Sequence, residues 1–214
     1  MITRRALLAA SLAVAAISAW AIPAWAITPA ASTTVDGPAA PIQALLDALL
    51  KSMKAGDAAP FPQRYKVLAP AVEVAFDISA TLQAAVGPRW STFTPAQQTQ
   101  LLDAFRTFTI ARYAENFDGF SGEKLELLPG TRQSGTDQIV PTQIVPASGD
   151  TVRIDYVMRQ SPQGWRAVDV LLNGTISQVA VQRSDFRALL ATGGPEALTA
   201  SLREKVATIS GHTL

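Results

Sequence analysis

The chain has no cysteine and a single histidine, and these two shortages exclude several kinds of chemistry. Without cysteine there can be no disulfide, no thiolate nucleophile, no cysteine-ligated metal and no lipid-modified cysteine anchor. The histidine, His212, lies close to the C-terminus, where chain ends fray. We therefore expect no catalytic triad, no metal site and no cofactor.

The sequence also lacks phosphate-binding loops and an excess of positive charge. Neither GxxxxGK[ST] nor GxGxxG occurs, and Gly174-Thr175-Ile176-Ser177 is not a GxSxG elbow, so it indicates a turn and a helix cap. Eighteen basic residues face 17 acidic ones, which gives no electrostatic basis for binding nucleic acid. The acidic residues are scattered singly, and no pair of carboxylates indicates glycoside hydrolysis. These absences disfavour an enzyme and predict no catalytic residue.

The first 26 residues are arranged like a secretory signal peptide. Arg4 and Arg5 form a basic start, Ala6–Trp20 an apolar run, and Ala24-Trp25-Ala26 a small-x-small cleavage site. We expect cleavage after Ala26 and export to the periplasm. The alternative is an uncleaved membrane anchor, because the apolar stretch is nearly long enough to span a bilayer. The paired arginines leave both the Sec and the twin-arginine export routes open.

The rest of the chain predicts one α+β domain. Residues 27–40 are rich in Pro, Ala and Thr and predict a disordered leader, and the domain follows over 41–210. Apolar residues at helical spacing predict helices over 41–55, 63–74, 78–86, 95–118 and 177–191, and a last one after Gly193-Gly194-Pro195. Alternating residues predict an antiparallel sheet of about four strands, over 124–128, 138–145, 151–160 and 165–172.

Two helix starts carry clear capping signals. Thr94-Pro95-Ala96-Gln97 has a capping threonine, a proline at the first helical position and a glutamine three residues after the cap. Asp77 precedes the apolar pattern of 78–86 and is expected to cap that helix.

The alternation of the last two strands predicts which side chains share a face of the sheet. Val168, Val170 and Leu172 form one apolar stripe, and Val152, Ile154, Tyr156 and Met158 form another. Asp169 falls on the opposite face, with Asp155, Arg153 and Arg159. A cross-strand ion pair is the simplest account of Asp169, so the apolar face becomes the place to look for function.

An ordered set of short motifs resembles the MlaC-like family of periplasmic lipid-transport proteins, also called the toluene-tolerance family. Within it, the segments GPRW, NFDGFSG, DYVMRQ and VAVQRSDFRALLA resemble the hopanoid-associated (HpnM-like) branch. The resemblance covers about Pro41 to Lys205. Its motifs are Phe76-Asp77, Trp90, Thr94-Pro95-Ala96-Gln97, Phe105, Tyr113, Gly122-Glu123, Trp165-x-x-x-Asp169, Gly174-x-x-Ser177, Arg183-x-x-Phe186 and Gly193-Gly194-Pro195-x-x-Leu198-x-x-x-Leu202.

The resemblance implies a twisted antiparallel sheet wrapped by helices around an apolar lipid pocket, with no enzymatic activity. It implies a monomeric carrier of phospholipid or a hopanoid-type lipid, with an inner-membrane ABC transporter complex and an outer-membrane lipoprotein complex as partners. A periplasmic chaperone or adaptor that binds apolar protein segments is the alternative. The residues expected to contact lipid are Phe76, Leu82, Trp90, Phe105, Phe108, Val152, Ile154, Tyr156, Val168, Val170 and Ile176.

Overall fold

The structure is a computed structural model that describes residues 37–214. The predicted signal peptide and most of the predicted leader lie outside the described residues. The last four leader residues, 37–40, form the 3-10 turn η1 (Gly37–Ala39) and the first residue of helix α1.

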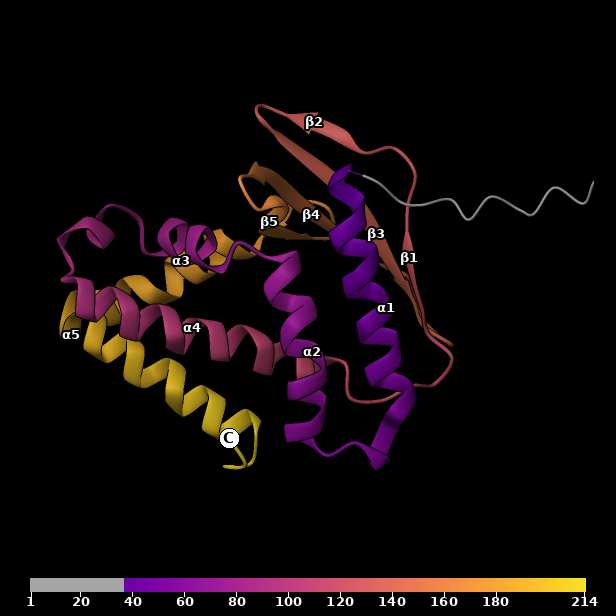
Figure 1. The fold of residues 1–214 in the computed structure, drawn as a ribbon, viewed down its shortest axis with the longest axis horizontal. Helices are drawn as coiled ribbons and strands as arrows, with labels where there is room; N and C mark the ends of the chain where they lie inside the picture. The colour runs from indigo at the N-terminus through magenta and orange to yellow at the C-terminus, as the bar shows by residue number, and fades with distance from the viewer. Residues whose placement is uncertain (1–36) are drawn as a thin grey trace, which may run out of the picture. The chain divides into compact units, whose positions relative to one another are not determined.

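Five α-helices lie in the described part of the chain (Figure 1). Four of them match the predicted helices within about three residues at each end. The predicted last two helices form one long helix, kinked at Gly194, where φ is 63° and ψ is −160°. The helices are α1 (Ala40–Ala55), α2 (Phe61–Ala75), α3 (Ile78–Val86), α4 (Pro95–Asn116) and α5 (Gln178–Ile209), with 3-10 turns η2 (Gly56–Ala58) and η3 (Gly87–Thr92).

The strands form one open antiparallel sheet, which confirms the α+β class. Its order is β1-β3-β4-β5-β6, and β2 also pairs with β3. The four predicted strands are present, but the sheet has six, because two very short strands have no readable alternation. The strands are β1 (Lys124–Leu127), β2 (Arg132–Ser134), β3 (Asp137–Val145), β4 (Val152–Ser161), β5 (Gly164–Leu172) and β6 (Ile176–Ser177).

The predicted caps form as the sequence indicates. The Thr94 hydroxyl accepts a hydrogen bond of 3.3 Å from the backbone N–H of Gln97. The Gln97 side chain in turn accepts a hydrogen bond of 2.8 Å from the backbone N–H of Thr94. Asp77 accepts the backbone N–H of Ala80 at 2.9 Å and so opens α3. Each cap supplies an acceptor to an N–H that has no partner inside its helix, typically worth about 1 kcal/mol.

A β-bulge changes the predicted face assignment in β5. The register of β4 and β5 shifts between Val157 and Met158: Val157 pairs with Asp169, whereas Met158 pairs with Ala167. Val168 therefore has no cross-strand partner and does not continue the stripe of Val170. Ala167 lies two residues before Asp169, so simple alternation would place it on the polar face, yet it is fully buried in register with Met158. One extra residue in a strand exchanges the faces of the residues beyond it.

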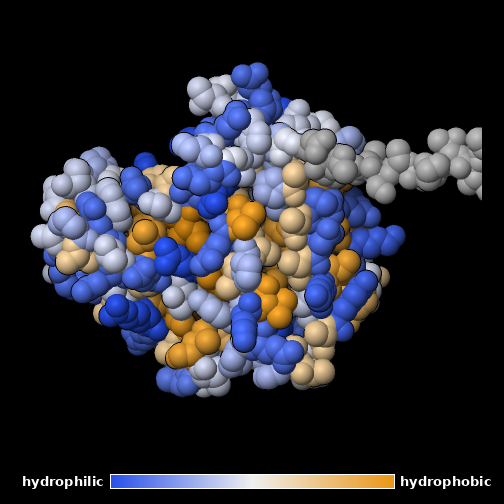
Figure 2. All heavy atoms as spheres, in the orientation of Figure 1, coloured by the Kyte–Doolittle hydropathy of each residue, from blue (hydrophilic) through white to orange (hydrophobic). Residues whose placement is uncertain are grey.

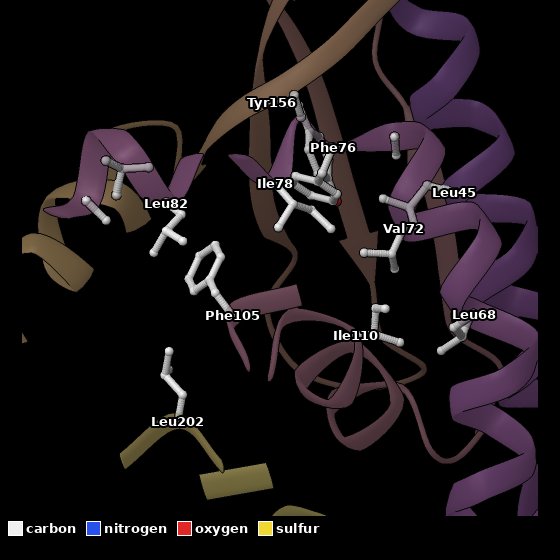
Figure 3. Close-up of a cluster of buried hydrophobic side chains, with 14 of the residues drawn as sticks. Leu45, Leu68, Val72, Phe76, Ile78, Leu82, Phe105, Ile110, Tyr156 and Leu202 are labelled. Carbon is white, nitrogen blue, oxygen red and sulfur yellow. The ribbon is translucent and has the colours of Figure 1, made fainter. Parts of the chain in front are cut away.

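Helices on several sides supply the core that packs against the sheet. α1 lies beside α2 and contacts β1, while α4 and α5 run side by side (Figure 1). The parallel bridge between Phe76 and Ala167 holds the junction of α2 and α3 to β5. Figure 3 shows side chains of α1, α2, α3, α4, β4 and α5 converging, among them Leu45, Val72, Phe76, Leu82, Phe105, Tyr156 and Leu202. Burying a side chain of this size stabilises a fold by about 2 kcal/mol.

Apolar residues on the viewed face appear as separate patches between polar side chains (Figure 2).

Among the helices of residues 37–214, none is both long enough and apolar enough to cross a membrane.

Candidate functional site

A cavity of about 1250 Å³ lies between the sheet, α4 and α5. Typical small-molecule sites occupy roughly 300–1,000 Å³, so this cavity suits a ligand larger than most metabolites. Its walls come from segments far apart in the chain, from α1 at one end of the sequence to the last turn of α5 at the other.

The sheet contributes one apolar wall. Ile154 and Tyr156 of β4 line the cavity together with Val170 and Leu172 of β5. These residues face each other in register, with Ile154 opposite Leu172 and Tyr156 opposite Val170. Cross-strand partners share a face of the sheet, so the four side chains form one continuous apolar surface.

Helix α4 contributes a second wall, which is mostly aromatic. Phe105, Phe108, Tyr113 and Phe117 line the cavity, together with Thr109 between them. Phe105, Thr109, Tyr113 and Phe117 are spaced four residues apart and so lie along one face of the helix. Tyr113 and Phe117 were not predicted as contact residues, although this helical spacing from Phe105 was a signal that could have found them.

Both halves of α5 border the cavity on the remaining side. Val179 and Phe186 come from the half before the kink, and Thr208 and Ile209 from the half after it. Phe186 packs edge-on against Phe105, with ring centroids 6.2 Å apart. The sequence analysis named none of these residues, because no local pattern shows that a bent helix returns to the same cavity.

Four aromatic rings form a connected cluster in the cavity wall. Ring centroids lie 5.6 Å apart for Phe76 and Tyr113, 6.1 Å for Phe76 and Tyr156, and 6.0 Å for the stacked Tyr113 and Phe117. Burial raises the pKa of Tyr156 to about 12, partly offset by a hydrogen bond with Tyr113. Burial also raises the pKa of Tyr113 well above its usual value, and the neighbouring Tyr156 adds to that shift. Both hydroxyls therefore stay protonated at neutral pH.

Charged side chains gather where the cavity meets solvent. Asp118, Asp185, Glu204 and Lys205 are exposed members of the lining, whereas the wall residues Phe105 and Tyr156 are buried. The Lys205 ammonium lies over the Phe108 ring, 5.9 Å from its centroid. The site is thus apolar inside and polar at its edge, an arrangement that suits an amphiphilic ligand.

Asp169 does not form the predicted cross-strand ion pair; it anchors the start of α5. Its carboxylate accepts the backbone N–H of Val179 at 3.0 Å and the hydroxyl of Ser177 at 2.5 Å. Ser177 is the N-cap of the helix and accepts the backbone N–H of Ala180 at 3.0 Å. A carboxylate is stabilised at this position because the helix N-terminus presents free N–H groups and positive potential.

The ion-pair account holds instead for Asp155. This fully buried carboxylate binds the guanidinium of Arg153 at 2.8 Å and that of Arg132 at 2.9 Å. Both arginines keep about half of their side-chain surface exposed, at 48% and 47%. The two carboxylates of neighbouring strands therefore have different structural roles: Asp155 forms ion pairs, and Asp169 anchors α5.

The structure brings six of the eleven predicted contact residues to the cavity and places five elsewhere. Phe76, Phe105, Phe108, Ile154, Tyr156 and Val170 line it. Leu82 lies in the core of α3, and Val168 is buried at the bulge outside the lining. Trp90 packs on Phe93 in η3, and Val152 and Ile176 are 41% and 50% exposed.

Among residues 37–214, no group of three or more His, Asp or Glu side chains is placed to hold a metal ion. Asp169 is the cavity carboxylate with the most hydrogen bonds, and it accepts two of them from the Ser177 hydroxyl and the Val179 backbone at the start of α5. What the geometry provides is apolar surface of ligand size.

The fold and the site together define an α+β protein built around an apolar cavity with a charged edge. The chain belongs to the MlaC family: the family described as "MlaC protein" matches residues 43–204. Its fold is also that of a phospholipid-binding protein from Ralstonia solanacearum, solved in complex with a phospholipid. That match has a TM-score of 0.71 and 24% identity, and covers 82% of this chain and 99% of the other.

Proposed function

We propose that the protein is a periplasmic lipid carrier that holds the tails of a phospholipid or a hopanoid-type lipid in the cavity between the sheet, α4 and α5. The observation that carries this proposal is the continuous apolar wall of Ile154, Tyr156 and Val170 facing the aromatic face of α4. Membership of the MlaC family supports it, as does the structural likeness to a protein solved with a phospholipid bound.

The physical need for such a cavity follows from the cost of exposing lipid tails. Each methylene exposed to water costs about 0.8 kcal/mol, so a palmitoyl-length chain costs roughly 13 kcal/mol. A carrier must cover this surface while leaving the headgroup in solvent. The apolar walls and the exposed charged edge meet these two requirements.

The location and the partners follow from the family and from the predicted signal peptide. In the periplasm, such a carrier would exchange lipid with an inner-membrane ABC transporter complex and an outer-membrane lipoprotein complex. Binding without catalysis is sufficient for this task. We propose that the carrier acts as a monomer.

Native mass spectrometry after incubation with phospholipid vesicles tests the proposal. We expect a lipid adduct on the wild-type protein and at least a tenfold lower occupancy for Val170→Glu, because a charge in the apolar wall is expensive to bury. The matched control is Val74→Glu, which changes a 57% exposed valine on α2 outside the cavity. Circular dichroism shows whether both variants remain folded.

Two outcomes would contradict the proposal. One is the absence of lipid from wild-type protein, both as purified from its host and after incubation with vesicles. The other is equal occupancy of the folded Val170→Glu and Val74→Glu variants, since the cavity would then not be where the lipid lies.

A further inference from the structure

Two tyrosine hydroxyls stand out in the apolar part of the cavity. Tyr113 of α4 and Tyr156 of β4 both line it, and both rings contact Phe76, which lies beside Tyr156 in Figure 3. Tyr156 is only 2% exposed. A polar group at such a depth needs a hydrogen-bond partner, because an unpaired buried hydroxyl destabilises a fold.

Among the described residues, neither hydroxyl makes a hydrogen bond to the backbone or to any side chain other than the partner tyrosine. A phenol both donates and accepts, so a hydrogen bond between the two tyrosines would use only one of their two O–H donors. The second donor is left over, and both residues border the space that a ligand would fill.

The threonine hydroxyls of the lining are already occupied. Thr81 donates its hydroxyl to the carbonyl oxygen of Asp77 at 2.8 Å, and Thr109 donates to that of Phe105 at 2.8 Å. Both threonines thereby satisfy their donor inside their own helices. The tyrosine pair differs from them because it retains a donor for a ligand.

We propose that Tyr113 and Tyr156 form a polar subsite that donates a hydrogen bond to an ester carbonyl of the bound lipid. The two cations of the lining, Arg112 and Lys205, are solvent-exposed. A phosphate placed deeper, among Phe76, Phe105 and Val170, would lose its hydration without a countercharge, so the acceptor there must be uncharged. An ester carbonyl is the neutral acceptor that a lipid carries where its tails join the headgroup. The inference rests on the proposed function and adds the linkage chemistry that the cavity selects.

A competition between ester and ether lipids tests this subsite. The purified protein is incubated with vesicles that contain equal amounts of a diester phosphatidylcholine and of its diether analogue with the same chains. Native mass spectrometry then gives the ratio of the two bound lipids. We expect the wild-type protein to favour the diester lipid about three- to tenfold, the range that one net hydrogen bond supplies.

Variants that remove only the hydroxyls show whether the preference for ester lipid comes from the two tyrosines. In Tyr113→Phe/Tyr156→Phe the rings are kept and both hydroxyls are lost, so we expect the ratio of bound diester to bound diether lipid to fall to about one. The double variant is required because either tyrosine alone still carries a donor. The matched control Thr109→Val removes a hydroxyl of the same cavity that donates to its own helix, and it should keep the wild-type ratio.

The outcomes separate this inference from the function on which it rests. Equal loading of ester and ether lipid by the wild type would overturn the subsite and leave the carrier function standing. An ester preference that persists in the double variant would also overturn it. Absence of both lipids from the wild type would contradict the carriage of phospholipid and the subsite together.

Discussion

At the residue scale, a carboxylate on β5 couples the sheet to the helix that completes the cavity. Asp169 accepts hydrogen bonds from the Ser177 hydroxyl and from the backbone of Val179, at the start of α5. Val179 itself lines the cavity. The position of this wall therefore depends on a polar contact outside the apolar surface.

Asp169→Ala should lower the free energy of unfolding by about 2 kcal/mol, because it removes a charged acceptor from two donors. Asp169→Asn should cost about half as much, since one acceptor oxygen remains. Urea denaturation followed by circular dichroism measures both. The control Asp103→Ala removes an exposed carboxylate paired only with Arg106 on the same helix, and it should change stability by less than about 0.5 kcal/mol. Equal effects of Asp169→Ala and Asp103→Ala would refute the anchoring role.

At the scale of elements, the kink of α5 lets one helix border the cavity twice. Gly194 has a φ of 63° and a ψ of −160°, which side chains with a Cβ rarely adopt, and Pro195 opens the second half of the helix. Phe186 lies before this point and Ile209 after it, and both line the cavity. A straight helix would carry its second half away from the site.

Gly194→Ala should destabilise the protein by about 2 kcal/mol, because alanine is strained at this φ and ψ. The added Cβ would also lie 3.3 Å from the Glu196 carboxylate. Gly119→Ala is the matched control: this glycine has open space around it and no left-handed φ, so its change should stay within about 0.5 kcal/mol. Urea unfolding midpoints of the two variants give the comparison, and indistinguishable midpoints would contradict the strain argument.

At the scale of the whole molecule, the separation of apolar and polar surface suits transport between membranes. The cavity is large and mostly apolar, and its edge is charged. A carrier that diffuses between two membranes must be released from both. Removal of the predicted signal peptide is the step that would release it after export.

Export with cleavage after Ala26 should yield a periplasmic protein whose first residue is Ile27. N-terminal sequencing and intact mass of the protein from the periplasmic fraction measure this directly. Ala24→Leu/Ala26→Leu should block processing, because signal peptidase requires small residues at these positions, and the full-length chain should then remain with the membrane. A full-length wild-type chain in the membrane fraction would favour the uncleaved anchor instead.

Local patterns were sufficient to predict much of the fold, and six of the eleven residues proposed to contact lipid line the cavity. Hydrophobic periodicity predicted α1 to α4 and the four longer strands, and the capping signals of Asp77 and Thr94 form as expected. The α+β class follows from their order. Alternation in β4 also predicted the cavity residues Ile154 and Tyr156. These features depend on hydrogen bonds and side-chain directions that neighbouring residues determine among themselves.

Tertiary structure alone decided the rest of the cavity. The bulge at Val168 placed Ala167 in the core, the strand ends left Val152 and Ile176 exposed, and the kink of α5 added a wall that no motif indicated. The role of Asp169 as the anchor of α5 depends on the contact between β5 and the first turn of that helix. The sequence by itself determined most of the helices, the four longer strands and the apolar face of β4. The position of the cavity depends on how segments far apart in the chain pack together. Local periodicity reflects only near neighbours, so it cannot predict that packing.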